Sequence, residues 1–97
     1  MSSRSKGRAN ELRARKVLEK EGWLCEKMNY SRFGHQDFFN LWDLIAVRDG
    51  EIKWVQVKTN RLPSHSYREE LRNFPGPGSK ELWVWYDRKA LPRIIYL

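Results

Sequence analysis

Three polar residues near the middle of the chain, Asp43, Gln56 and Lys58, have the side-chain types that metal-assisted hydrolysis requires. A carboxylate with neighbouring oxygen atoms can hold Mg²⁺, which prefers oxygen ligands and keeps several waters. A lysine beside them can orient or deprotonate a water molecule and offset developing negative charge. Together these groups describe hydrolysis of a phosphodiester by a metal-positioned water, provided that the fold brings them together.

The dipeptide Asp49-Gly50 predicts the turn that brings these residues together. Two runs rich in β-forming residues flank it, which is a strong signal for a two-residue hairpin. Counting outward from the turn gives these pairs: Arg48 with Glu51, Val47 with Ile52, Ile45 with Trp54, and Asp43 with Gln56. Directly opposed residues share a face, and Lys58 projects from that same face one step further on. The register therefore gathers Asp43, Gln56 and Lys58 at one end of the hairpin, whereas a slip of one residue would separate them.

The rest of the hairpin is apolar on both faces. One face carries Ile45, Val47, Ile52 and Trp54, and the other carries Leu44, Ala46, Val55 and Val57. A sheet that is apolar on both faces lies between two other layers. Polar groups left unpaired in such a sheet would be costly. A site at the open end of the sheet explains the three polar residues better.

A helix is predicted from about residue 8 to residue 21, with Gly22 as its stop. Glu11 shares its inner side with Ala14 and Leu18, so this acid faces the protein body and could add a second carboxylate to the site. Residues 1–5 are expected to be frayed.

The other elements complete a single domain over residues 1–97. We expect a strand over 23–28, a loop over 29–42, a short helix, and strands over 81–87 and 91–97. Ser66 is the expected cap of the short helix, with Glu69 completing a capping box. The predicted order is αβββαββ, in which helices cover a sheet.

Three segments resemble the PD-(D/E)XK nuclease superfamily and, within it, the archaeal-type and phage Holliday junction resolvases. KGRANELRARKVLEKEGW resembles their opening helix, which has a basic start and an internal Glu. LWDLIAV resembles their PDLIA-like strand, with Trp42 where proline is common. VQVKTN resembles their E-x-K-(S/T) strand, with Gln56 in the place of the acid. The likeness covers about residues 6–60, and the remainder matches in element order alone.

The resemblance implies an α/β fold with a restriction-endonuclease-like αβββαβ core, in which helices pack against a mixed central sheet. It also implies a metal-dependent endonuclease that uses Mg²⁺, with Mn²⁺ as a substitute. Asp43 would be the central metal ligand, beside the Gln56 amide oxygen and the Val57 carbonyl. Glu11 would assist metal binding, and Lys58 would act on the attacking water or the scissile phosphate. A neutral amide binds Mg²⁺ more weakly than a carboxylate does.

The charge of the chain favours nucleic acid as the partner. The net charge is +7, and residues 1–32 contribute nine basic and four acidic side chains to it. Such an excess favours DNA binding with steep salt dependence. The predicted phosphate contacts are Arg4, Lys6, Arg8, Arg13, Arg15 and Lys16 on the helix, and Arg32, Lys53 and Arg61 on loops near the site.

Location and assembly follow from other features of the sequence. Cys25 is the only cysteine, which excludes an intrachain disulfide. No apolar run is long enough to span a membrane, so we expect a cytoplasmic protein without a membrane partner. Junction resolution would need two symmetric cuts, hence a homodimer. Aromatic strands near the C-terminus, including Trp83 and Trp85, are candidates for that interface or for packing against a helix.

Two other functions and several ordinary explanations stay open. The chain could be a nuclease-fold DNA- or RNA-binding protein with weak or lost cleavage, which Gln56 favours, or a small structural RNA-binding protein. Taken singly, Asp43 is an edge acid able to pair with Arg48 or Lys58, and Lys58 is a surface lysine. Glu11 alone is ordinary helix-dipole complementation. Only the combined register favours a catalytic site.

Overall fold

In the described part of the chain, two helices and five strands follow one another in the predicted order αβββαββ. The computed structural model describes residues 3–27, 38–39 and 41–97. The elements are α1 (Ser3–Lys20), β1 (Leu24–Lys27), β2 (Leu44–Arg48), β3 (Glu51–Thr59), α2 (His65–Arg72), β4 (Ser79–Trp85) and β5 (Arg93–Tyr96). The α/β class is therefore confirmed.

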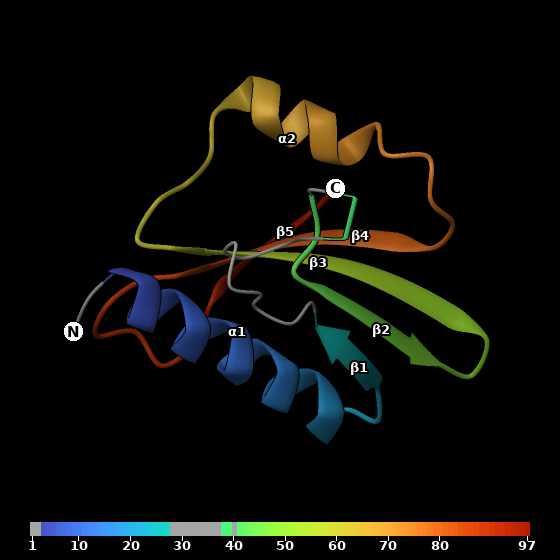
Figure 1. The fold of residues 1–97 in the computed structure, drawn as a ribbon, viewed down its shortest axis with the longest axis horizontal. Coiled ribbons are helices and arrows are strands. Elements are labelled where there is room, and N and C mark those ends of the chain that lie inside the picture. The colour runs from blue at the N-terminus through green and yellow to red at the C-terminus, as the bar shows by residue number, and fades with distance from the viewer. Residues whose placement is uncertain (1–2, 28–37, 40) are drawn as a thin grey trace.

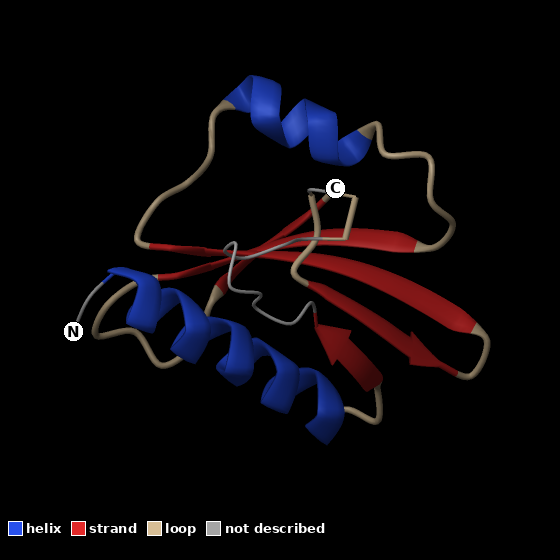
Figure 2. Ribbon diagram, viewed as in Figure 1, coloured by secondary structure: helices blue, strands red, loops and turns tan. Residues whose placement is uncertain are grey.

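The described strands form one open sheet in the order β1-β2-β3-β4-β5. β3 and β4 are parallel and the other neighbours are antiparallel, so the sheet is mixed. A parallel pair needs a crossover connection, and α2 lies in the one between β3 and β4. α1 runs along one face of the sheet and α2 lies over the other, as Figure 1 and Figure 2 show.

The β2–β3 hairpin has the predicted turn and register. Asp49 and Gly50 both have positive φ, 49° and 81°, which is the backbone that a type I′ turn requires. The structure contains the predicted pairs Arg48–Glu51, Val47–Ile52 and Ile45–Trp54. The ladder ends at Leu44–Val55. Asp43 therefore stands where the regular pairing of β2 stops.

The α1 face of the sheet holds one of two apolar clusters. Ala14 and Leu18 of α1 are fully buried against Val55 and Val57 of β3 and against Trp83 and Trp85 of β4. The two tryptophans are each 2% exposed. They pack against the helix, which confirms that alternative for the two tryptophans, and they are not exposed for the dimer interface that was the other alternative. Cys25 is also buried here, and this burial raises the pKa of its thiol.

The α2 face holds the second cluster. Trp42 and Trp54 pack there with Leu71 of α2 and with Leu82 and Val84 of β4. Even-numbered residues of β3 therefore face α2 and odd-numbered ones face α1, because side chains alternate along a strand. Gln56 and Lys58 consequently project toward α2.

Two element boundaries differ from those predicted. α1 begins at Ser3, so its first turn includes residues expected to be frayed. α2 is capped by Ser64, whose hydroxyl accepts the Tyr67 N–H at 3.2 Å, and not by Ser66. The serine two residues earlier takes the cap because α2 already starts at His65. The expected capping box with Glu69 is therefore absent.

Side-chain hydrogen bonds and an ion pair stabilise the edge of the sheet where β3 and β4 end. Asn60 has a positive φ of 57°, and its side-chain oxygen accepts the Asp87 N–H at 2.8 Å. The Asp87 carboxylate pairs with Lys6 of α1 at 2.8 Å, and this hydrogen bond, followed by the effect of the Asn60 side chain, lowers the pKa of that carboxyl. Asn10 of α1 donates to Thr59 at 2.8 Å. The N-terminal half of α1 is thus fixed beside the last residues of β3.

Candidate active site at the end of the sheet

Asp43 is a buried carboxylate that takes over where the β2–β3 ladder ends. Asp43 is only 4% exposed and immediately precedes β2. Its backbone N–H donates to the Val55 carbonyl at 3.0 Å. Its Oδ2 accepts the backbone N–H of Val57 at 2.8 Å, where a strand would have placed a backbone carbonyl. The backbone N–H of Val57 therefore holds the carboxylate against β3, close to the end of that strand.

Gln56 lies against Asp43, as the register predicts. In the amide orientation that gives each atom a complementary partner, the nitrogen donates to Asp43 Oδ2 at 2.7 Å and to the Leu41 carbonyl at 3.0 Å. The amide oxygen accepts from the Tyr67 hydroxyl at 2.8 Å. Gln56 is 2% exposed, so its polar groups are satisfied within the protein.

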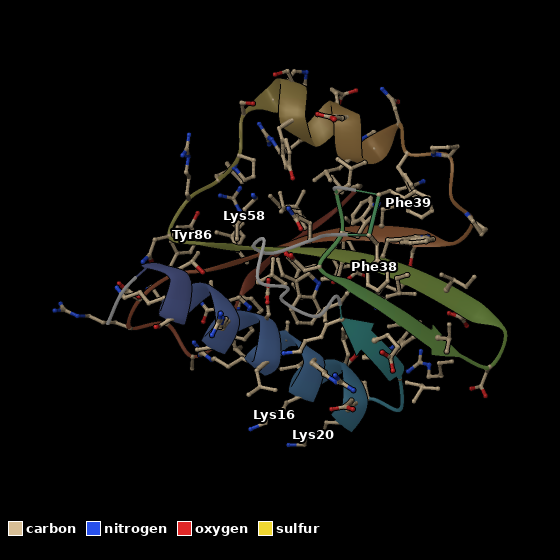
Figure 3. The ribbon with its side chains drawn as sticks, in the orientation of Figure 1. Lys16, Lys20, Phe38, Phe39, Lys58 and Tyr86 are labelled. Atoms are coloured by element: carbon tan, nitrogen blue, oxygen red, sulfur yellow. The ribbon has the colours of Figure 1, made fainter. Side chains whose placement is uncertain are left out.

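Lys58 projects from β3 on the same side, toward α2 (Figure 3). Its ammonium nitrogen lies 5.1 Å from the centre of the Tyr67 ring. This distance is within the range of cation–π attraction. Lys58 lines a pocket together with Tyr67 and part of the β3–α2 connection. The structure therefore places Lys58 and Gln56 on two parts of the same tyrosine.

Glu11 reaches the sheet from the other side. It is 7% exposed on α1, which confirms that this acid faces the protein body. α1 covers the face of Val57 and Thr59, whereas Gln56 and Lys58 project toward α2. The structure thus joins Asp43, Gln56 and the Val57 backbone directly, and Glu11 belongs to the opposite layer.

The donor atoms suit a hard cation after one rotation of the Gln56 amide. Among the described residues, no group of three or more His, Cys, Asp and Glu side chains could hold a metal ion. The expected ligands include only two carboxylates, Asp43 and Glu11, with an amide and a carbonyl oxygen. In the orientation that satisfies both of its polar atoms, Gln56 turns its nitrogen toward Asp43. Rotating the amide by a half turn would bring its oxygen there, and the Tyr67 hydroxyl can accept from the nitrogen equally well.

The predicted phosphate-contact residues fall into distinct groups. Arg8 and Lys16 are exposed on α1, Arg15 lies 3.5 Å from Glu19, and Lys6 pairs with Asp87. Arg13 stacks on the Trp85 ring at 4.1 Å and donates to Asn10 at 3.1 Å. Arg61 is exposed beside Lys58. Arg32 lies outside the described residues, as does the side chain of Arg4.

Lys53 is not on a loop near the site, contrary to the prediction. It lies within β3 on the α1 face, and its ammonium is 3.0 Å from the Glu81 carboxylate. It also lies 4.5 Å from the centre of the Trp23 ring. The predicted position is wrong because Lys53 has the odd parity of Val55 and Val57, which turns it to the opposite face from Lys58.

Sequence reasoning missed Tyr67, which contacts both Gln56 and Lys58. The position of Tyr67 in the first turn of α2 is set by the helix cap. Ser64 is the N-cap residue, and its side chain accepts the Tyr67 N–H. Assigning the cap to Ser66 hides this placement. The Asn10–Thr59 bond was missed as well, and no local pattern signals it.

Comparison of the chain with protein-family models, with curated proteins and with solved structures gives no match. Neither of the helices in the described part of the chain is long and apolar enough to cross a membrane.

Proposed function

We propose that this protein is a metal-dependent nuclease of the PD-(D/E)XK type that hydrolyses DNA phosphodiester bonds. The observation that carries the proposal is the contact between the Gln56 amide and Asp43 Oδ2, 2.7 Å apart, with Lys58 two positions further along β3 on the same face. A core strand has no structural need for an amide and an ammonium at these two positions. A catalytic site at the end of the sheet accounts for both.

The surroundings of these residues support this proposal. The αβββαβ order and the mixed sheet agree with the core expected for that superfamily. Asp43 and Glu11 are both buried, and burial makes a carboxylate a more effective partner for a cation by removing competing water. Lys58 stands beside a pocket whose opening gives a substrate access.

The residues would divide the chemistry as follows. Asp43, the Val57 carbonyl and the rotated Gln56 amide would hold Mg²⁺, whereas Glu11, in the α1 layer on the other side of the sheet, would not be a direct ligand. The bound ion would polarise the scissile phosphate and lower the pKa of a coordinated water. Lys58 would orient that water and offset the negative charge that develops on the phosphate. Tyr67 would fix Gln56 in either amide orientation.

A second candidate is nucleic-acid binding without cleavage, and one observation favours it. The Val57 N–H donates to Oδ2 of Asp43, and in the amide orientation that satisfies both polar atoms of Gln56 the Gln56 nitrogen donates to the same oxygen. This arrangement is complete without a metal ion at that oxygen. A protein using it only as a structural link would keep its basic surface and bind DNA or RNA without cutting it.

The test is cleavage of linear, flapped and four-way-junction DNA in Mg²⁺, Mn²⁺ or EDTA. The variant is Asp43→Asn, because an asparagine oxygen can still accept the Val57 N–H while the negative charge is lost. We expect cutting by the native protein with either metal, none in EDTA, and at least a 100-fold loss in the variant.

The matched control is Asn73→Ala, a change at an exposed residue after α2 that should cut like the native protein. DNA binding without cutting in either metal would refute the nuclease and support the second candidate. Equal cutting by the native protein and Asp43→Asn would place the active site elsewhere.

A further inference from the structure

A pocket of about 310 Å³ opens beside Lys58. It is lined by Lys58, Arg61, Pro63, Ser64 and Tyr67. These residues belong to the end of β3, the connection that follows it, and the first turn of α2. Figure 3 shows Lys58 directed into the space between the sheet and α2. The volume lies at the lower end of the range for ligand pockets, roughly 300–1,000 Å³.

The lining combines positive charge with an aromatic wall. Among the described lining residues, the two that are charged, Lys58 and Arg61, are both cations. Neither forms an ion pair with another described residue, whereas Lys6, Arg15, Lys53 and Arg72 each do. Tyr67 and Pro63 supply flat apolar surface next to these charges. Cations beside an aromatic ring suit a phosphate joined to a base.

A second pocket meets the first at Lys58. It is lined by Lys6 and Gly7 of α1, by the last three residues of β3 and by Asn60 just after them, and it has a volume of about 350 Å³. Lys58 therefore stands between a pocket on the α1 side and a pocket on the α2 side. A chain of phosphates that crosses the end of β3 would pass this lysine.

We propose that the pocket formed by Lys58, Arg61 and Tyr67 binds a single unpaired nucleotide of a nucleic-acid strand, next to the phosphate at the candidate active site. Arg61 contacts the nucleotide's phosphate and Tyr67 stacks on its base. The inference rests on the proposed function in placing a strand at this end of the sheet. It adds that the nucleotide in the pocket is unpaired. The pocket has room for one nucleotide, and a base pair would require space for the partner nucleotide as well.

The experiment measures binding of a fluorescently labelled ten-nucleotide DNA strand and of the same sequence as a duplex, in EDTA so that nothing is cut. The variants are Arg61→Ala and Tyr67→Leu. Arg72→Ala is the control, since Arg72 is an exposed arginine in the last turn of α2 that pairs with Glu69. Tyr67→Phe is a third variant, which separates loss of the hydroxyl from loss of the ring.

We expect Arg61→Ala to weaken single-strand binding about tenfold and to reduce the slope of log affinity against log salt by about 0.7, the value for one lost phosphate contact. Tyr67→Leu should weaken it by about five- to 150-fold, the range for one lost base stack, and Tyr67→Phe, which keeps the ring, should lose less than Tyr67→Leu. Both losses should be smaller with the duplex.

Losses for Arg61→Ala no larger than those for Arg72→Ala would overturn the proposal, as would equal losses with single strand and duplex. These outcomes are separate from those for the nuclease. Metal-dependent cutting with Arg61-independent binding would refute the pocket alone. Binding that depends on Arg61, by a protein that never cuts, would refute the nuclease and leave the pocket standing.

Discussion

Lys53 and Lys58 lie five positions apart on β3, yet the two lysines have opposite surroundings. Lys53 faces α1, where its ammonium is 3.0 Å from the Glu81 carboxylate. Trp83 donates to the same carboxylate at 2.9 Å. Lys58 faces α2 and forms no ion pair with any other described residue. The five-residue spacing changes the parity, and hence the face, because side chains alternate along a strand.

The difference separates a charge used for structure from a charge open to a ligand. The side chains of Lys53 and Glu81 are 14% and 6% exposed, so each neutralises the other away from water. A buried pair of this kind fixes the pairing of β3 with β4 and becomes costly when one partner is lost. Lys58 is half-buried at a pocket beside the Gln56–Asp43 contact. Its charge is available for a phosphate.

The largest effect is expected from Lys58→Met, which keeps an unbranched side chain one atom shorter and removes the charge. Cleavage of DNA in Mg²⁺ should fall by about 10²–10⁴-fold, the usual contribution of a positioned proton-transfer group. The melting temperature should stay close to the native value, since the lost ammonium lies over the Tyr67 ring and forms no ion pair with another described residue. Initial cutting rates and thermal melts on the same samples measure both.

Lys20→Met is the control for this change, because Lys20 is an exposed lysine on α1 (Figure 3). It should cut at the native rate. If Lys58→Met cuts as fast as Lys20→Met, Lys58 has no catalytic role and the contrast with Lys53 is only one of burial.

The same substitution at Lys53 should act on stability. Lys53→Met leaves the Glu81 carboxylate buried without its cation, and removing one partner of a buried pair costs about 3–5 kcal/mol. Chemical denaturation at neutral pH should show this loss in the free energy of unfolding. Below the melting transition, the folded fraction should cut at close to the native rate.

The double change Lys53→Met with Glu81→Leu should recover much of the lost stability, because an apolar pair can replace a buried ion pair. A Lys53→Met protein as stable as the native one would show that the ion pair does not fix this part of the sheet.

Gln56→Glu is expected to make stability depend on metal. A second carboxylate beside Asp43 replaces an amide that donates a hydrogen bond, so the variant should lose about 1–3 kcal/mol of stability in EDTA. Mg²⁺ or Mn²⁺ at 100 times its dissociation constant should restore about 2.7 kcal/mol. Thermal melts with and without metal measure the difference.

Asn73→Asp is the matched change from amide to acid at an exposed residue, and it should show no such metal dependence. If added metal does not raise the melting temperature of Gln56→Glu beyond that of Asn73→Asp, the end of the sheet is not a metal site.

The smallest effect is expected from Tyr67→Phe. It removes the hydroxyl that contacts Gln56 and keeps the ring beneath Lys58. The free energy of unfolding should fall by about 0.5–1.5 kcal/mol, the net value of one hydrogen bond. The control Tyr96→Phe, at a residue 74% exposed, should lower the free energy of unfolding by less. Equal changes at the two tyrosines would mean that Tyr67 does not hold Gln56.

Local signals in the sequence predicted the hairpin that carries the site. Asp49-Gly50 selects one turn type, that turn fixes the register, and the register places Asp43 next to Gln56. The same alternation places Lys53 on the face of Val55 and Val57, whereas the predicted phosphate contact at Lys53 considers its charge alone. Periodicity along α1 likewise indicated that Glu11 turns inward.

Contacts between segments that are far apart in the chain could not be predicted from the sequence. The approach of Tyr67 to Gln56 depends on the angle at which α2 crosses the sheet, and the Asn10–Thr59 bond depends on where α1 lies along β3. No local pattern encodes these distances, because they are set by the packing of two apolar clusters. The burial of Trp83 and Trp85 under α1 has the same origin, since alternation gives a strand two faces without saying what covers each.

The central claim is that Asp43 and Gln56 form a metal site at the end of the sheet. Its most direct test is a titration with Mn²⁺, in which electron paramagnetic resonance measures the free ion, on the native protein and on Asp43→Asn. The account predicts saturable binding by the native protein and binding at least tenfold weaker in the variant, with the fold of both confirmed by circular dichroism. Equal Mn²⁺ binding by the two folded proteins, or none by the native protein, would contradict it.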